Sequence, residues 1–111
     1  MIRYRIEISD RAMKDIEDYV GYIQRQSGSI EIGLRWGESV LKAIEALQTT
    51  PTKFQIAAEQ VYCDYEVRRV LIGKYLALYH VDETALIVKV LSFRHGARLP
   101  QPEDLPNEPP N

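Results

Sequence analysis

The chain has 111 residues, of which 45% are hydrophobic and 27% charged, and its formal net charge is −2. This composition is typical of one soluble globular domain. Proteins that hold nucleic acid by neutralising phosphates usually have a clear excess of basic residues, whereas here 14 Lys and Arg stand against 16 Asp and Glu. Any nucleic-acid role would therefore depend on a local basic cluster.

Cysteine and histidine counts limit the chemistry further. Cys63 is the single cysteine, so no intrachain disulfide can form, and with two histidines in the whole chain the sequence predicts no metal site and no cofactor. The N-terminus lacks the apolar core of a signal peptide, and no apolar run approaches the ~20 residues of a membrane span. We expect a cytoplasmic protein without a membrane partner.

The N-terminal half predicts a strand followed by a helix. Apolar and charged residues alternate over residues 2–8, which is typical of a half-buried strand. Ser9 follows as a candidate N-cap, and apolar residues then recur at three- and four-residue spacing up to about Gln26. Ser27 and Gly28 are expected to end this helix.

A second amphipathic helix is expected from about Ser29 or Ile30 to Gln48, and Thr50-Pro51 would stop it. Gly33 and Gly37 lie one turn apart within it, at a cost of about 1 kcal/mol each against alanine. Either they are simply tolerated, or the backbone of this helix approaches the first helix closely. Because residues 27–29 form so short a connection, we expect an antiparallel helical hairpin.

The second half of the chain changes to strand patterns. Residues 52–61 lack periodicity and are interpreted as a loop, and three strands are expected over residues 66–72, 75–81 and 85–93. The short turns between them favour an antiparallel meander. The predicted order is β-α-α-β-β-β, an α+β fold in which an antiparallel sheet packs on an α-helical hairpin.

The domain is expected to cover residues 1–98, and the Pro-rich acidic tail, residues 99–111, is expected to be mostly disordered because it can bury little apolar surface. Both faces of the last two strands are fairly apolar, and one helical layer covers only one face. The other face would be a partner site, unless the tail or the 52–61 loop covers it.

The order of these elements, together with four local features, resembles the RelE/ParE superfamily of type II toxins. The features are an arginine-bearing strand at Arg68 or Arg69, the turn Gly73-Lys74-Tyr75, a strand ending near Tyr79, and the sequence HGAR at His95–Arg98. The resemblance covers residues 2–100 and is closer to the ParE branch.

This resemblance implies a small growth-inhibiting toxin, of the kind linked to plasmid stabilisation, that a cognate antitoxin holds inactive. A toxin–antitoxin hetero-oligomer is implied, with DNA contacted only through the antitoxin. ParE-like members poison DNA gyrase, and RelE-like members cut mRNA in the ribosomal A site. The second activity is the alternative, with ribosome and mRNA as partners.

The residues favour the gyrase branch. RNA cleavage needs a group that takes the 2′-hydroxyl proton and groups that stabilise a charged phosphorane. The resemblance implies that RelE-like enzymes use several basic residues and a late tyrosine, but no tyrosine follows Arg98 here and no lysine cluster accompanies Arg68. We therefore expect a non-enzymatic inhibitor rather than an endoribonuclease.

If the chain does cut RNA, His95 would be the general base and Arg98 would hold a phosphate together with Arg94. The other interpretation makes the HGAR sequence structural, with Arg98 paired to an acid such as Glu66. The residues predicted to bind a partner are listed here: Arg68, Arg69, Tyr75, Tyr79, Arg94 and Arg98.

Overall fold

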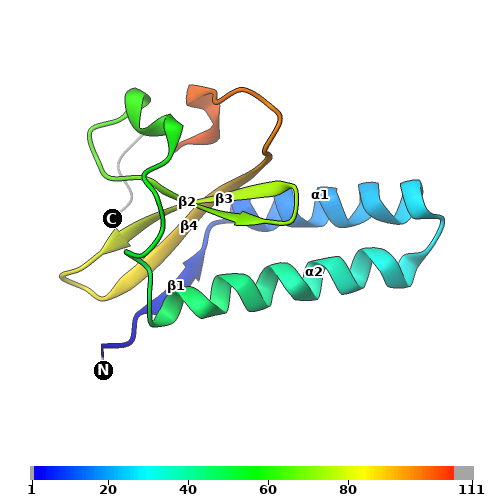
Figure 1. The fold of residues 1–111 in the computed structure, drawn as a ribbon, viewed down its shortest axis with the longest axis horizontal. Coiled ribbons are helices and arrows are strands. Elements are labelled where there is room, and N and C mark those ends of the chain that lie inside the picture. The colour runs from blue at the N-terminus through cyan, green and yellow to red at the C-terminus, as the bar shows by residue number, and fades with distance from the viewer. Residues whose placement is uncertain (1, 107–111) are drawn as a thin grey trace.

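The structure, a computed structural model, describes residues 2–106 (Figure 1). Strand β1 (Arg5–Ile8) leads into helices α1 (Asp10–Ser27) and α2 (Ile30–Glu45), and three strands follow: β2 (Arg68–Ile72), β3 (Tyr75–Asp82) and β4 (Ile87–His95). Three short 3-10 helices, η1 (Ala46–Gln48), η2 (Ala58–Tyr62) and η3 (Pro102–Asp104), complete the described elements. The predicted order of the strands and helices, and the α+β class, are confirmed.

The sheet is mixed, with strand order β1-β4-β3-β2. Strands β2, β3 and β4 form the expected antiparallel meander, whereas β1 pairs in parallel with β4, with Arg5 opposite Ile87. The parallel pair follows from the helical hairpin. Because the two helices are antiparallel, the chain returns after α2 to the end of the sheet at which β1 begins. A β-bulge between Leu78 and Tyr79 shifts the β3–β4 register.

The helical hairpin forms as the sequence predicts. The Ser9 hydroxyl accepts a hydrogen bond from the Ala12 amide at 3.0 Å, and Gly28 ends α1 with a left-handed φ of 69°. The Ser29 hydroxyl then caps α2 through the Ile32 amide. Both helices lie side by side and extend well beyond the sheet (Figure 1).

The two helices approach closely at Gly33. A Cβ atom added to Gly33 would lie 2.9 Å from the carbonyl oxygen of Val20, and one added to Gly37 would lie 3.2 Å from a methyl group of Val20. The first distance is shorter than side-chain carbons tolerate and involves rigid backbone. Gly33 is therefore needed for packing, which decides between the two interpretations of the glycine pair.

Each face of the sheet has its own core. The helix-side core joins both helices to the sheet, with Ile16, Val40, Ile44, Tyr79 and Phe93 among its members. The back-face core is smaller and consists of Ala57, Val67, Leu78, Leu91 and Leu105. Figure 1 shows η2 and η3 across the sheet from α2, where they cover this second core. The tail and the 52–61 loop therefore cover most of the back face of the sheet, which is the second of the two predicted alternatives.

The first part of the tail is part of the domain. Asp104 and Leu105 are buried, and the Ser92 hydroxyl donates to the Asp104 carbonyl at 2.6 Å. The prediction of a mostly disordered tail is thus wrong for residues 99–106, because a few specific contacts compensate for a polar composition. Residues 107–111 lie outside the described residues.

Replacing Gly33 with alanine is expected to destabilise the domain by about 1–3 kcal/mol, because the strain of overpacking exceeds the gain in helix propensity. Gly21→Ala in α1 is the matched control, since its Cβ would meet only the flexible end of the Arg25 side chain, at 3.3 Å. The control should be neutral or stabilising by up to about 1 kcal/mol. Urea unfolding of both variants measures this, and equal effects would contradict the close approach.

Candidate functional site

The segment His95–Arg98 lies at the end of β4, where elements from both faces of the sheet meet. On the helix side, the rings of Tyr19, Trp36 and Tyr75 pack together, with the Trp36 and Tyr75 centroids 5.0 Å apart. The His95 ring continues this cluster at 5.3 Å from Tyr75, in an edge-to-face arrangement. The histidine is therefore packed as one more aromatic ring.

A hydrogen bond within the turn holds the His95 ring. The Ala97 amide donates to Nδ1 of His95 at 3.0 Å, so Nδ1 serves as a hydrogen-bond acceptor within the turn. The nitrogen with a lone pair is already engaged. To act as a general base, His95 would first have to break this turn.

Arg94 lies on the opposite face and is buried. Its guanidinium pairs with Glu59 of η2, and the two side chains are 4% and 0% exposed. Nη1 also donates to the carbonyl oxygens of His95 and Arg98, at 3.3 and 2.8 Å. Arg94 therefore binds the loop after β4 from inside and has no surface to offer a partner, which corrects its predicted role.

Tyr75 and Tyr79 are also interior residues. Tyr75 is buried in the aromatic cluster, and the Tyr79 hydroxyl donates to the Pro51 carbonyl at 2.6 Å in a fully buried position. Burial raises the pKa of Tyr79 to about 12 and raises the pKa of Tyr75. The prediction that both tyrosines bind a partner is corrected to a packing role, because alternation along β3 does not show which face the helices cover.

Arg98 is paired within the chain. Its Nη2 donates to Oδ1 of Asp104 at 2.7 Å, and Arg11 of α1 approaches the same oxygen at 3.4 Å. The hydrogen bond to Asp104 raises the pKa of Arg98, so the guanidinium stays charged. An acidic partner was expected, but it is Asp104 of the tail, since Glu66 pairs with Arg68 at 2.8 Å.

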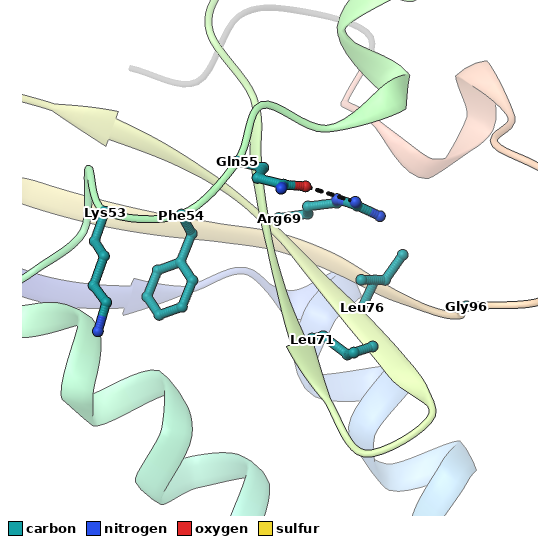
Figure 2. A pocket seen from close by; sticks show the side chains of 7 residues that line it. All are labelled: Lys53, Phe54, Gln55, Arg69, Leu71, Leu76 and Gly96. Carbon is teal, nitrogen blue, oxygen red and sulfur yellow. Dashed lines mark hydrogen bonds between the residues drawn. The ribbon is translucent and has the colours of Figure 1, made fainter.

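Arg68 and Arg69 face opposite sides of β2, as strand alternation requires. Arg68 is partly buried and also donates to the Phe54 carbonyl, whereas Arg69 donates to the Gln55 side chain at 2.8 Å. Arg69 lines an open groove of about 420 Å³ with Lys53, Phe54, Gln55, Leu71, Leu76 and Gly96 (Figure 2). The structure thus separates Arg69 from Arg98, which lines no part of this groove.

Sequence reasoning missed three parts of this region. Glu59 lay in a segment without periodicity, Asp104 lay in a tail expected to be disordered, and the groove depends on Leu71 and Leu76 from two strands. A glutamate directly after Ala57 and Ala58 in the 52–61 loop was the available signal for a buried partner of an arginine. The described residues contain no group of three His, Cys, Asp or Glu side chains that could hold a metal ion.

The comparisons with known proteins agree with this architecture. Residues 6–100 match the family described as ParE toxin of type II toxin-antitoxin system, parDE. No curated protein matches the chain significantly. Across the described residues, neither helix is long and apolar enough to cross a membrane.

Solved structures with the same fold come from bacteria and an archaeon. A chain of the chromosomal ParDE system of P. aeruginosa is 12% identical, with a TM-score of 0.67 and coverage of 86% of this chain and 98% of that one. A chain of the RelE–RelB complex of Pyrococcus horikoshii is 18% identical, with a TM-score of 0.59 and coverage of 89% and 100%. A mutant of the E. coli toxin RelE in the free state is 15% identical, with a TM-score of 0.56 and coverage of 86% and 85%.

These solved structures share the fold of the chain, and the family model over residues 6–100 decides its family. The chain belongs to the ParE toxin family of type II toxin–antitoxin systems.

Removing the Arg94 side chain should destabilise the protein strongly. Arg94→Met leaves Glu59 as an unpaired charge in the interior, which costs about 3–5 kcal/mol. The double variant Arg94→Met/Glu59→Met removes both charges and should regain most of this loss. Urea unfolding measures both, and a single variant within about 1 kcal/mol of the parent would contradict the structural role of the pair.

Stability should fall as pH rises from about 10 to about 12 through Tyr79. In this window the unfolded chain has released the phenolic proton and the folded chain still holds it, so each step up in pH favours unfolding. Tyr79→Phe should flatten the dependence of unfolding free energy on pH, at a cost of about 1 kcal/mol for the lost hydrogen bond. Equal slopes for parent and variant would refute this prediction.

Proposed function

We propose that the chain is the toxin of a type II toxin–antitoxin pair, that it inhibits growth by binding DNA gyrase in the cytoplasm, and that a cognate antitoxin neutralises it. Membership of the ParE toxin family supports the class. The solved structures of similar fold, which belong to a ParDE system and a RelE–RelB complex, support an antitoxin partner.

The state of His95 supports binding rather than RNA cleavage. Its Nδ1 accepts from the Ala97 amide, and its ring packs on Tyr75. The best candidate for a general base is therefore already hydrogen-bonded and part of the packing. Arg98, the candidate phosphate ligand, is already paired with Asp104. Binding to a protein target through surface complementarity does not require the side chains of His95 and Arg98 to be free.

One observation favours the alternative, a ribosome-dependent mRNA endonuclease. Lys53 and Arg69 both line the groove, and no acidic residue does. A basic groove attracts phosphates, but neither cation has a proton acceptor beside it among the groove residues. The groove therefore supports binding of an anionic group more than chemistry on one.

Expression of the chain alone should arrest growth, and purified protein should inhibit supercoiling by DNA gyrase in vitro. His95→Gln keeps a hydrogen-bonding side chain of similar size but cannot act as a base at neutral pH. It should inhibit gyrase within about twofold of the parent, since the proposed activity uses no proton transfer.

The proposal would be reversed in favour of the endonuclease by two results together. The parent protein would cleave mRNA in a translation extract, with this activity lost in His95→Gln, and supercoiling by gyrase would stay normal. Absence of growth arrest by the folded parent protein would reject the toxin activity itself.

A further inference from the structure

Helix α2 has two apolar stripes, and only one of them packs within the domain. The inner stripe continues into η1 and lies against α1 and the sheet, with these members: Gly33, Trp36, Val40, Ile44 and Leu47. The outer stripe consists of Ile30, Leu34, Gly37 and Leu41, and its three large side chains are 71%, 54% and 46% exposed. Single exposed leucines are ordinary on a protein surface, but three large apolar side chains on one helix face form a patch.

The spacing of the outer stripe is that of a seam between two helices. Its members follow one another at intervals of four, three and four residues, which keeps them on one narrow face of α2. This alternation is the heptad pattern of coiled coils, in which such side chains insert between those of a facing helix. Figure 1 shows α2 along one border of the molecule, on a hairpin that extends beyond the sheet. A facing helix therefore has room to reach it.

The outer stripe is complementary to a second copy of itself turned end for end. If Ile30 faces Leu41 of the second copy, Leu34 faces Gly37 of the second copy in the same register, because both pairs are centred on the same point of the helix. Gly37 has no side chain, so it leaves room for the opposing leucine and lets the two backbones approach closely. Large side chains thus meet glycine at the two central layers and meet each other at the two outer layers.

The charges beside the outer stripe match in the same antiparallel arrangement. Acids and bases alternate along its exposed flank, at Glu31, Arg35, Glu38 and Lys42. Glu31 would lie about 3 Å along the axis from Lys42 of the second copy, and Arg35 would have the same offset from Glu38 of the second copy. Helical side chains lean toward the N-terminus of their own helix, so these opposite charges lean toward each other. The two acids Glu31 and Glu38, at an equal offset in the other direction, lean apart.

We propose that the outer stripe of α2 is a dimerisation surface for a second copy of this chain. The two α2 helices pack antiparallel about a two-fold axis near Arg35 and Trp36, and the two hairpins form a four-helix arrangement. The stripe spans about three turns, or about 16 Å, so the contact is short and the dissociation constant should be about 1–100 µM. This surface is separate from the groove at Arg69, and the inference does not depend on the cellular target.

Two other occupants fit the outer stripe less well. Helices that lie on a membrane surface usually have a basic polar face, whereas the flank of this stripe has two acids and two bases. A helix of an unrelated protein would have to supply a small residue opposite Leu34 and the matching order of charges. A second copy already has both.

Sedimentation equilibrium of the full-length chain over about 5–500 µM tests the proposal. The parent should pass from monomer to dimer in this range. Leu34→Glu places a charge at the centre of the seam and should weaken self-association about tenfold or more. Ile32→Glu is the matched control, since Ile32 lies on the same helix and is 45% exposed but is outside the outer stripe. The control should associate within about twofold of the parent.

A charge reversal tests the antiparallel register. Arg35→Glu sets two acids against each other at both ends of the two-fold axis and should weaken the dimer about three- to tenfold. The double variant Arg35→Glu/Glu38→Arg restores both pairs with their signs exchanged and should regain the association of the parent. Thermal unfolding checks that each variant is folded, which is expected because all the substituted side chains are exposed.

Three results would overturn the proposal. The first is a parent protein that stays monomeric over the whole concentration range. The second is an equal loss of association in Leu34→Glu and Ile32→Glu. The third is a double variant that associates no better than Arg35→Glu, since a parallel dimer or a dimer through another surface would show no such rescue.

Discussion

The buried pair of Arg94 and Glu59 is the interaction on which the C-terminal part of the structure depends. Glu59 fixes η2 against the back of the sheet, and Arg94 donates to two carbonyls of the following loop. A buried charge pair is rarely a large net gain, but each charge without the other is expensive. The pair therefore specifies one arrangement of β4, η2 and the His95–Arg98 turn rather than many similar ones.

The remainder of this region follows from that arrangement. With the turn held from the back, the His95 ring is directed to the helix side, where Tyr75 receives it. Arg98 is directed toward the tail, where Asp104 meets it and where Arg11 of α1 also reaches. One end of the sheet thus becomes a junction between the helical hairpin, the last strand and the tail.

Much of the fold could be predicted from the sequence, because its signals are local. Ser9 and Gly28 bound α1 where capping chemistry places them. The short turns between apolar runs identify the three strands of the meander. The parallel pairing of β1 with β4 could not be predicted, since it depends on the path of the whole hairpin. Nor could the period of two along a strand show which face of β3 the helices cover, and so Tyr75 and Tyr79 were assigned to the surface.

The candidate site was less predictable than the fold for a related reason. Arg94, Arg98 and His95 were identified, but their partners lie in segments without periodicity. Composition makes residues 99–106 look unable to order, yet a buried leucine and one carboxylate shared by two arginines are enough to place them. Averaged properties of a segment miss the few contacts that decide its position.

The pairing of β1 with β4 also bears on how the molecule forms. Arg5 pairs with Ile87, so the first strand of the chain has no neighbour in the sheet until nearly all of the domain has been synthesised. Contacts between residues so distant in sequence slow folding, because the entropy of closing a long loop is lost before these contacts form. During synthesis the helical hairpin can form early from local contacts, but the sheet cannot be completed until its last strand arrives. The chain is therefore without its finished surface for most of its synthesis, and its structure is assembled late and as a unit.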